Sequence, residues 1–277
     1  MGFGFFTGKF SIALVIGTVL GVAVLFGAPK IVGALTGNVA ISCGEISSDI
    51  YSSYLNSGAT ESFIVPATGS QSFASWSNSA NTTTLSTLSS SPSYVANGIG
   101  SYPALLFSGS ACLTASSNKD KYKNNFTLVV FAKPTQTTTV HAQSASGVAG
   151  AYNVSYLITP EWGTRWNSGA NYYNGVGISV GTNVVEVAEH SGGYLPIVLS
   201  LTIPTADQSK YNQGMIITLR YNNKNPSLKI TDIYGGNVIT KSATYTRADN
   251  QNFYLSYDIN CSTYGRYSGY VGNIYYY

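Results

Sequence analysis

The amino-acid sequence predicts an all-β sandwich preceded by one apolar N-terminal helix. A run without any charged residue extends from Phe10 to Pro29. From about residue 60 onward, the hydrophobic pattern changes to the alternation that is typical of strands. Only 9 % of the 277 residues are charged, against about a quarter in ordinary soluble proteins. We therefore expect a hydrophobic helical segment in residues 1–38, a connector in 39–60 and a β-sandwich domain in 61–277.

The apolar run is long enough for a helix that crosses a bilayer. At about 1.5 Å per residue it spans about 30 Å, which is the thickness of the hydrocarbon core. Lys9 and Lys30 flank it, so the positive-inside rule does not orient it. Small residues at a spacing of four favour close helix packing. The predicted membrane or assembly helix comprises the run from Phe10 and includes Gly17, Gly21, Ala23 and Gly27.

Four N-x-S/T sequons lie C-terminal to this helix and are candidate glycosylation sites. Glycosylation would place residues 40–277 outside the membrane. Chance sequons are also expected, because Asn, Ser and Thr are abundant in this chain. The four acceptors are Asn81, Asn125, Asn153 and Asn260.

Short β-branched and aromatic segments, bounded by Gly, Pro, Asn or Ser, predict the strands. Residues 222–226 and 234–237 have the composition of turns between strands. Residues 70–91 are rich in Ser, Thr and Asn, and we expect them to form a solvated loop. The clearest predicted strands are 127–132, 153–158, 215–221 and 228–233.

Similarity to a known family rests on five segments: Phe73–Asn78, Pro92–Ser110, Phe126–Pro134, Gly177–Gly193 and Tyr267–Tyr276. In this order they resemble segments of concanavalin A-like, laminin-G-type jelly-roll domains. The resemblance covers about residues 60–277 and implies two antiparallel sheets packed face to face. It does not imply one activity, since this fold hosts lectins, glycan hydrolases, adhesion modules and structural domains. Ser108 stands where the family often has Asp, which puts a metal role at that edge in doubt.

Three cysteines allow three possible pairings. The family resemblance favours Cys112 with Cys261, because the first and last strands of such domains are neighbours. Three buried free thiols are the alternative.

The apolar helix before a β-rich head also resembles type IV pilin-like filament subunits. Precursors of that family are cut just before the apolar run, which here would fall after Lys9. We keep a self-assembling filament subunit as an alternative hypothesis.

The acidic residues do not show the pattern of glycan hydrolases on this fold, which place carboxylates two residues apart on one strand. Glu186 and Glu189 are three apart, so on a strand they would face opposite sides. Of the two histidines, His141 and His190, we expect the second to order a turn. Neither a metal site nor a cofactor is predicted, because no ligand spacing for zinc and no acidic cluster for calcium is visible.

Composition excludes several classes of protein. Intrinsic disorder and a coiled coil both require many more charged residues. A formal net charge of +3 provides no basic stripe, so we expect no nucleic-acid partner. The 22 tyrosines are typical of strands and interfaces, and Tyr275 and Tyr277 should lie on the opposite face of the last strand from Tyr276. Candidate glycan-stacking residues are Trp162, Trp166, Tyr172 and Tyr173.

These observations favour a non-enzymatic, membrane-anchored structural protein of a virion or cell surface, with its C-terminal domain outside. The expected partners are a lipid bilayer and copies of the same chain. A glycan-binding adhesin is a further alternative, in which surface glycans are the partners.

Overall fold

A computed structural model gives the structure of residues 58–115, 121–143, 153–160, 173–190, 197–243, 252–263 and 265–277. The chain divides into two units, Met1–Gly44 and Glu45–Tyr277. The first unit lies outside the described residues, and so does the predicted helix of residues 10–29.

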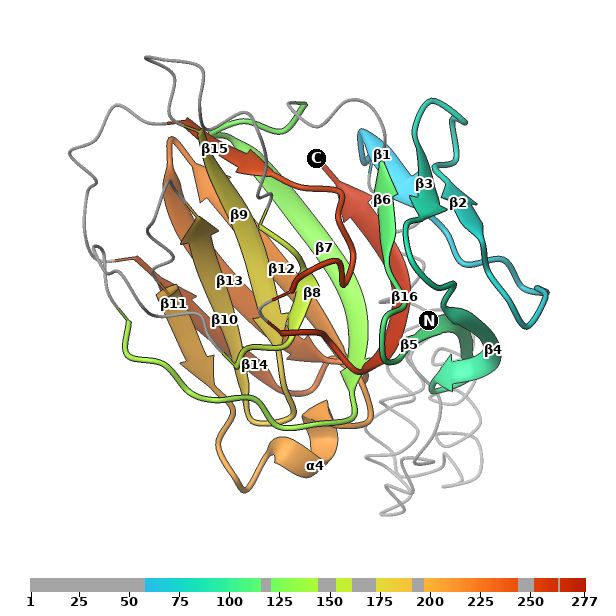
Figure 1. The fold of residues 1–277 in the computed structure, drawn as a ribbon. Helices are drawn as coiled ribbons and strands as arrows, with labels where there is room; N and C mark the ends of the chain where they lie inside the picture. The colour runs from blue at the N-terminus through green and yellow to red at the C-terminus, as the bar shows by residue number, and fades with distance from the viewer. Residues whose placement is uncertain are drawn as a thin grey trace, which may run out of the picture. The chain divides into compact units, whose positions relative to one another are not determined.

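The described strands form three sheets (Figure 1). Sheet A has the order β14-β13-β12-β7-β16-β5-β4, with β1 also paired to β16. Sheet B has the order β11-β10-β9-β15, with β8 also paired to β9. Sheet C has the order β2-β3-β6. The pairings are antiparallel except for β15, which runs parallel to β9. The strands of sheet A are β1 (Glu61–Phe63), β4 (Ser93–Ile99), β5 (Tyr102–Phe107), β7 (Phe126–Pro134), β12 (Met215–Asn222), β13 (Asn225–Asp232), β14 (Val238–Ser242) and β16 (Gly269–Tyr276). Sheet B comprises β8 (Tyr156–Ile158), β9 (Tyr173–Val180), β10 (Val184–His190), β11 (Ile197–Thr202) and β15 (Asn252–Leu255), and sheet C comprises β2 (Ser75–Ser77), β3 (Thr84–Thr87) and β6 (Leu113–Ala115).

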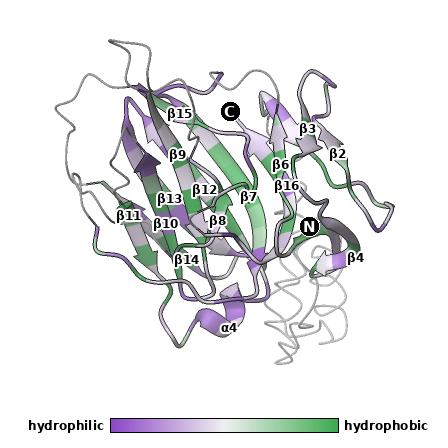
Figure 2. Ribbon diagram, viewed as in Figure 1, coloured by the Kyte–Doolittle hydropathy of each residue, from purple (hydrophilic) through white to green (hydrophobic). Residues whose placement is uncertain are grey.

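Sheets A and B pack face to face around the main core. Alternation along β7 sends Leu128, Val130 and Ala132 into this core, as expected for side chains of period two. The neighbouring Val129 and Phe131 belong to a second apolar cluster on the opposite side of sheet A. Hydrophobic residues accordingly run along the central strands of both sheets (Figure 2). The all-β, largely antiparallel fold class predicted from the sequence is confirmed, whereas the jelly-roll assignment stays a prediction.

The β12–β13 hairpin shows how turn chemistry sets the register. Asn222 pairs with Asn225, which leaves Asn223 and Lys224 as the two loop residues. Both have positive φ, 47° and 68°, which is the backbone of a turn that matches the twist of the two strands. The turn predicted at residues 222–226 is therefore confirmed.

The C-terminal tyrosines divide between the two faces of β16 as predicted. Tyr276 is fully buried in the main core. Tyr275 is fully buried in the cluster on the other side of sheet A, and Tyr277 packs against the same cluster.

The predicted solvated loop at residues 70–91 is wrong. This segment contains β2 and β3, which pair with each other, and each strand buries one apolar side chain, Trp76 and Leu85. A strand with one buried face needs only one apolar residue in two. Ser and Thr fill the other positions, and they concealed the alternation in the sequence.

The helical content of the described residues is small. The four-residue helix α4 (Gln208–Tyr211) is the only one among them. Within the described part of the chain, no helix is both long and apolar enough to cross a membrane. The membrane-anchored location predicted from the sequence is corrected on this finding.

Candidate functional site

A buried carboxylate lies on the outer face of sheet B, the face that points away from sheet A. Along β10, Val185 and Val187 belong to the main core, so Glu186 between them points to the opposite side. Its side chain is fully buried. The register places Ser179 of β9 and Ser200 of β11 directly beside Glu186. A carboxylate in this position requires hydrogen-bond donors, because burial of an isolated charge is costly.

His141 supplies two of these donors from the segment that follows β7. Its backbone N–H donates to Oε1 of Glu186 at 2.8 Å, and its ring Nδ1 lies 2.9 Å from Oε2. The hydroxyl of Ser200 donates to Oε1 at 3.0 Å. We call His141, Glu186 and Ser200 the sheet B triad.

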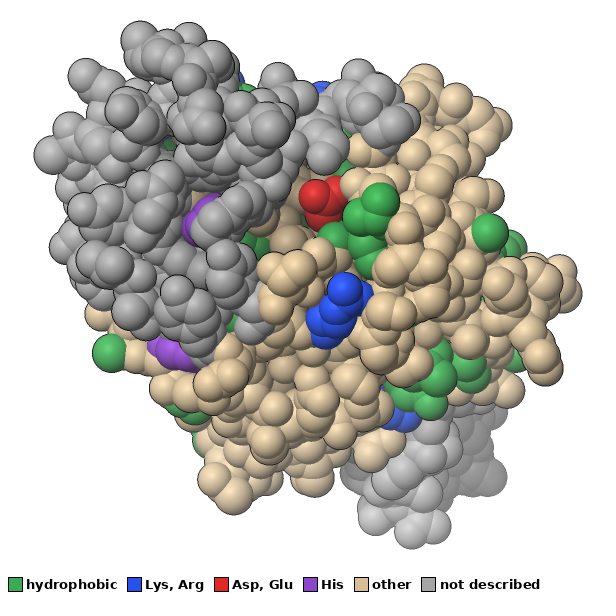
Figure 3. All heavy atoms as spheres, viewed as in Figure 1, with side chains coloured by type: hydrophobic (Ala, Val, Ile, Leu, Met, Phe, Trp, Pro, Cys, Tyr) green, Lys and Arg blue, Asp and Glu red, His purple; other side chains and the backbone are tan. Residues whose placement is uncertain are grey.

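The segment that carries His141 is fixed to the β9–β10 hairpin. The backbone N–H of Thr138 donates to Oδ1 of Asn183 at 2.9 Å, and Nδ2 of Asn183 donates back to the Thr138 carbonyl at 2.9 Å. These two bonds hold the segment across the end of sheet B. Figure 3 views the molecule from the side of sheet B, and histidine side chains (purple) are visible there.

Tyr156 lies close enough to Glu186 to respond to its charge. Burial, and then the negative charge of Glu186, raise the pKa of the Tyr156 phenol far above its usual range. The side chain is fully buried, and its hydroxyl has no hydrogen-bond partner among the described residues. A buried hydroxyl without a partner is unusual in native proteins. It therefore marks the neighbourhood of the triad as incomplete in hydrogen bonding.

The triad can bind and orient a polar ligand. His141 keeps 13 % of its side chain exposed, whereas Glu186 has none exposed. One oxygen of Glu186 accepts from the His141 backbone N–H and the other lies 2.9 Å from the ring Nδ1, so the carboxylate fixes the orientation of the imidazole. The imidazole is thus the accessible group, and Glu186 and Ser200 hold it in place.

Glu189 and Glu186 face opposite sides of β10, as their spacing predicted. Oε1 of Glu189 accepts a hydrogen bond of 2.8 Å from the hydroxyl of Tyr221, a residue of the main core. His190 is the buried last residue of β10, the second strand of the β9–β10 hairpin. Residues 191–196, which follow it, lie outside the described residues, so its role in ordering a turn stays a prediction. The turn of this hairpin is at residues 181–183, at the other end of the strand.

A second buried carboxylate, Glu61 of β1, has a complete set of donors. Oε1 accepts from Nδ2 of Asn78 at 2.8 Å and from the hydroxyl of Thr83 at 2.5 Å. Nζ of Lys121 lies 3.3 Å from the same oxygen. Oε2 accepts from the hydroxyls of Tyr122, at 3.0 Å, and Tyr257. We call these six residues the Glu61 cluster.

The donors control the ionisation of Glu61. Burial acts to raise the pKa of this carboxyl, but the hydrogen bonds from Thr83, Tyr257 and Tyr122 and the charge of Lys121 together outweigh it, so the pKa is lowered. The carboxylate is therefore the stable form in the fold. Because every group in the cluster is already satisfied, we assign the cluster to stability.

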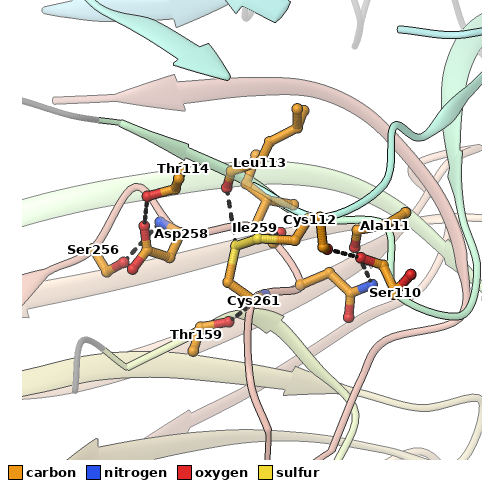
Figure 4. Close-up of a disulfide and its surroundings, with 12 residues drawn as sticks. Ser110, Ala111, Cys112, Leu113, Thr114, Thr159, Ser256, Asp258, Ile259 and Cys261 are labelled. Carbon is orange, nitrogen blue, oxygen red and sulfur yellow. Dashed lines mark hydrogen bonds between the residues drawn. A yellow bond between two sulfur atoms is a disulfide. The ribbon is translucent and has the colours of Figure 1, made fainter. Parts of the chain in front are cut away.

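Cys112 and Cys261 form a disulfide between the residue before β6 and the loop after β15 (Figure 4). This is the pair that the family resemblance implied. The backbone N–H of Cys261 donates to the Thr159 hydroxyl at 2.9 Å, and Thr114 donates to Asp258 nearby. Cys43 lies outside the described residues.

The remaining predicted site residues do not converge on the triad within the described residues. Asn81, Asn125 and Asn153 are exposed, whereas Asn260 is buried. Trp162, Trp166 and Tyr172 lie outside the described residues, as do Phe10, Gly17, Gly21, Ala23 and Gly27, and the side chain of Tyr173 is not described. Among the described residues, no group of three His, Cys, Asp or Glu side chains could hold a metal ion.

Sequence reasoning missed the pairing of His141 with Glu186. One signal was present, because an isolated carboxylate in the apolar run from Val184 to Ala188 indicates a buried, partnered group. The identity of the partner had no local signal, since His141 is 45 residues away.

Comparison with known proteins gives no family assignment. No protein-family model and no curated protein matches the chain. Two solved structures are similar: full-length tailspike protein 2 from an Escherichia coli O157:H7 bacteriophage (TM-score 0.43, 16 % identity) and the enzymatically active domain of tailspike protein 2 from bacteriophage CBA120 (TM-score 0.42, 15 % identity). The match covers 69 % of this chain in both cases, but only 25 % and 28 % of those chains. The predicted absence of enzymatic activity is corrected on this finding, because one of the similar structures is an enzymatically active domain.

Proposed function

We propose that this chain is a surface protein of the adhesion type, whose sandwich binds a carbohydrate on the outer face of sheet B. The observation that carries the proposal is the sheet B triad. An imidazole, a carboxylate and a hydroxyl converge there from three separate segments, with hydrogen bonds of 2.8–3.0 Å. His141 is the proposed contact residue, and Glu186 and Ser200 are positioning residues.

The chemistry of the face supports a neutral, hydroxyl-rich ligand. Sugar hydroxyls both donate and accept hydrogen bonds, so their sites need a few fixed donors and acceptors among apolar groups. The imidazole of His141 is the partly exposed polar group of the triad. The apolar residues Val154, Ala188 and Ile197 pack with Tyr156 in one cluster, so the polar groups are set in apolar surroundings.

The surface location is supported by composition and covalent structure. A disulfide between Cys112 and Cys261 favours an oxidising compartment outside the cytoplasm. With only 9 % charged residues, few ions would be desolvated when this surface meets a ligand. We include in the proposal the concanavalin A-like type of sandwich, which the sequence segments at 92–110 and 267–276 resemble.

Acid–base chemistry on the same ligand is the second candidate function. It is favoured by the 2.9 Å contact between Nδ1 of His141 and Oε2 of Glu186. In such a pair the carboxylate orients the imidazole, which is the side chain that most often transfers protons in general acid–base catalysis.

Binding to a panel of surface polysaccharides, with sugar release measured on the same samples, tests both candidates. We expect His141→Ala and Glu186→Gln each to weaken binding at least about tenfold, equal to about 1.4 kcal/mol. Asp207→Asn, in an exposed ion pair with Lys210, is the control and should bind as the unmodified protein does.

Three results separate the candidates. Binding without release supports the adhesin, and release that His141→Ala abolishes supports the acid–base function. Absence of binding to every member of the panel by the folded, oxidised protein would overturn both.

A further inference from the structure

The four sequons differ in whether the fold leaves room for a glycan. An N-linked glycan is attached to the side-chain nitrogen Nδ2 of Asn, and the bulky group needs a surface position. The exposure and hydrogen bonding of each Asn side chain therefore decide which sequons are compatible with the folded protein.

Asn260 is incompatible. Its side chain is fully buried, and Nδ2 donates to the carbonyl of Ala111 at 2.8 Å. Oδ1 accepts from the backbone N–H of Tyr267 at 2.6 Å. The next residue, Cys261, is in the disulfide. A glycan on Nδ2 would break the first bond and would have to replace packed core atoms, so the sandwich could not close around it.

Asn81 and Asn153 are compatible. Both are exposed and both have positive φ, 54° and 59°, a conformation that Asn adopts more readily than most residues. Asn81 lies in the connection between β2 and β3, and Asn153 lies shortly before β8. Connections of this kind at the surface tolerate added groups without disturbing the ladders.

Asn125 is compatible for a different reason. Its side chain is exposed, and its Oδ1 accepts a 2.7 Å hydrogen bond from the backbone N–H of Asn223 in the β12–β13 turn. This hydrogen bond involves Oδ1 and does not involve Nδ2, the atom to which the glycan is attached. A glycan at Asn125 therefore preserves the contact between the two segments.

The structure also restricts when the glycan is added. The hydroxyl residue of the Asn81 sequon, Thr83, is 2 % exposed and donates to Glu61. The hydroxyl residue of the Asn153 sequon, Ser155, is 3 % exposed, and its backbone N–H donates to Ser179 at 3.0 Å. An enzyme that recognises N-x-S/T cannot reach these residues once the sheets have formed.

We propose that the mature protein carries N-linked glycans at Asn81, Asn125 and Asn153, those at Asn81 and Asn153 being attached before the sandwich closes, and that Asn260 carries none. The proposal rests on the surface location in the proposed function, but not on its ligand. Glycans at three sites would hydrate a surface with few charged side chains.

Site-resolved mass spectrometry of the oxidised protein from its native source tests the proposal. Enzymatic release of the glycans in heavy-oxygen water converts each occupied Asn to a labelled Asp. We expect label at Asn81, Asn125 and Asn153 and unlabelled Asn at position 260.

Single substitutions give a second readout. Asn81→Gln, Asn125→Gln and Asn153→Gln should each remove one glycan from the intact mass, whereas the exposed Asn225→Gln, which lies outside any sequon, should remove none. Ser262→Ala destroys the fourth sequon while keeping Asn260, and it should leave the intact glycan mass unchanged.

A glycan on Asn260 in the folded, disulfide-bonded protein would overturn the proposal, and so would the absence of a glycan from any of the other three sequons. These outcomes are distinct from failure of the proposed ligand. A protein that is glycosylated at the three sites but binds no polysaccharide refutes only the carbohydrate ligand.

Discussion

Replacing Glu61 with alanine removes the acceptor for the whole Glu61 cluster. The hydroxyls of Thr83, Tyr122 and Tyr257 all donate to this carboxylate and would lose their acceptor. Asn78 keeps a second bond, because its Nδ2 also donates to Thr82 at 2.8 Å. The perturbation therefore removes the carboxylate acceptor of three buried hydroxyls, of which those of Tyr122 and Tyr257 can still bond to each other.

The expected loss is several kcal/mol. Each buried donor left without an acceptor costs about 1–3 kcal/mol, so three would cost about 3–9 kcal/mol if nothing relaxed. Water entering the space of the lost side chain would satisfy some of them. Breaking one partner of a buried charged network costs about 3–5 kcal/mol in other proteins. We therefore expect Glu61→Ala to lower the free energy of unfolding by about 3–5 kcal/mol.

Urea unfolding at pH 7, followed by far-UV circular dichroism, measures this loss. Asp207→Asn serves as the control, because its ion pair with Lys210 is exposed and should contribute about 0.5 kcal/mol or less. A loss below about 1 kcal/mol for Glu61→Ala, with an unchanged slope against urea, would refute the structural role of the cluster.

The same cluster predicts a pH dependence of definite sign. The pKa of Glu61 is lowered from its ordinary value of 4.5, so the unfolded chain binds the proton more tightly than the folded one. The contribution of Glu61 is therefore fully present above about pH 4.5 and is lost as the pH falls through the folded pKa. The stability difference between the unmodified protein and Glu61→Gln should narrow over that range. A stability difference between the two proteins that stays constant down to pH 2 would contradict this pH dependence.

Three further predictions concern other parts of the fold. Removing the disulfide with Cys112→Ala and Cys261→Ala should lower the free energy of unfolding by about 4–5 kcal/mol in the chain-entropy model, because 149 residues separate the two cysteines. Thermal unfolding of both forms measures this loss, and an unchanged unfolding midpoint would contradict the prediction. Burial raises the pKa of Tyr211 and Tyr275 to about 12, above the ordinary value of 10. Stability should therefore be lost as the pH rises from 10 towards 12, and tyrosinate absorbance should appear together with unfolding. Ionisation of all tyrosines in the folded state near pH 10 would refute this prediction. Gly269→Ala should cost about 2–3 kcal/mol, since Gly269 has a φ of +148° and an added Cβ would lie 2.4 Å from the Lys133 carbonyl; chemical denaturation would show whether the strand accommodates the methyl group.

The strands that could be predicted were those with a strong local signal. Residues 215–221 and 228–233 are apolar, β-branched and separated by turn residues, and the structure places β12 and β13 there. Residues 70–91 lacked that signal, because Ser and Thr at the outward positions outnumber the buried Trp76 and Leu85. The local sequence pattern indicates which face of a strand is buried only when the outward residues are clearly more polar than the inward ones and the two kinds alternate.

The residues that surround Glu61 and Glu186 could not be predicted from the local sequence pattern. The residues whose side chains donate hydrogen bonds to Glu61 lie between 17 and 196 positions away from it in the chain. His141 reaches Glu186 from a segment that Asn183 holds against the hairpin through Thr138. Both arrangements follow from the order of strands in the sheets, which no short motif encodes.

The contrast between these two carboxylates separates a structural role from a functional one. Glu61 and Glu186 are both buried, so burial alone does not distinguish them. All the donors around Glu61 are satisfied within the chain, which leaves nothing for a ligand to add. Beside Glu186, the Tyr156 hydroxyl has no hydrogen-bond partner in the part of the chain that the structure describes, and 13 % of the His141 side chain is exposed. If this distinction is correct, Glu61→Gln should reduce stability and leave polysaccharide binding per folded molecule unchanged, whereas Glu186→Gln should reduce binding in the protein that remains folded. Equal effects of the two substitutions on binding per folded molecule would show that the outer face of sheet B has no special part in recognition.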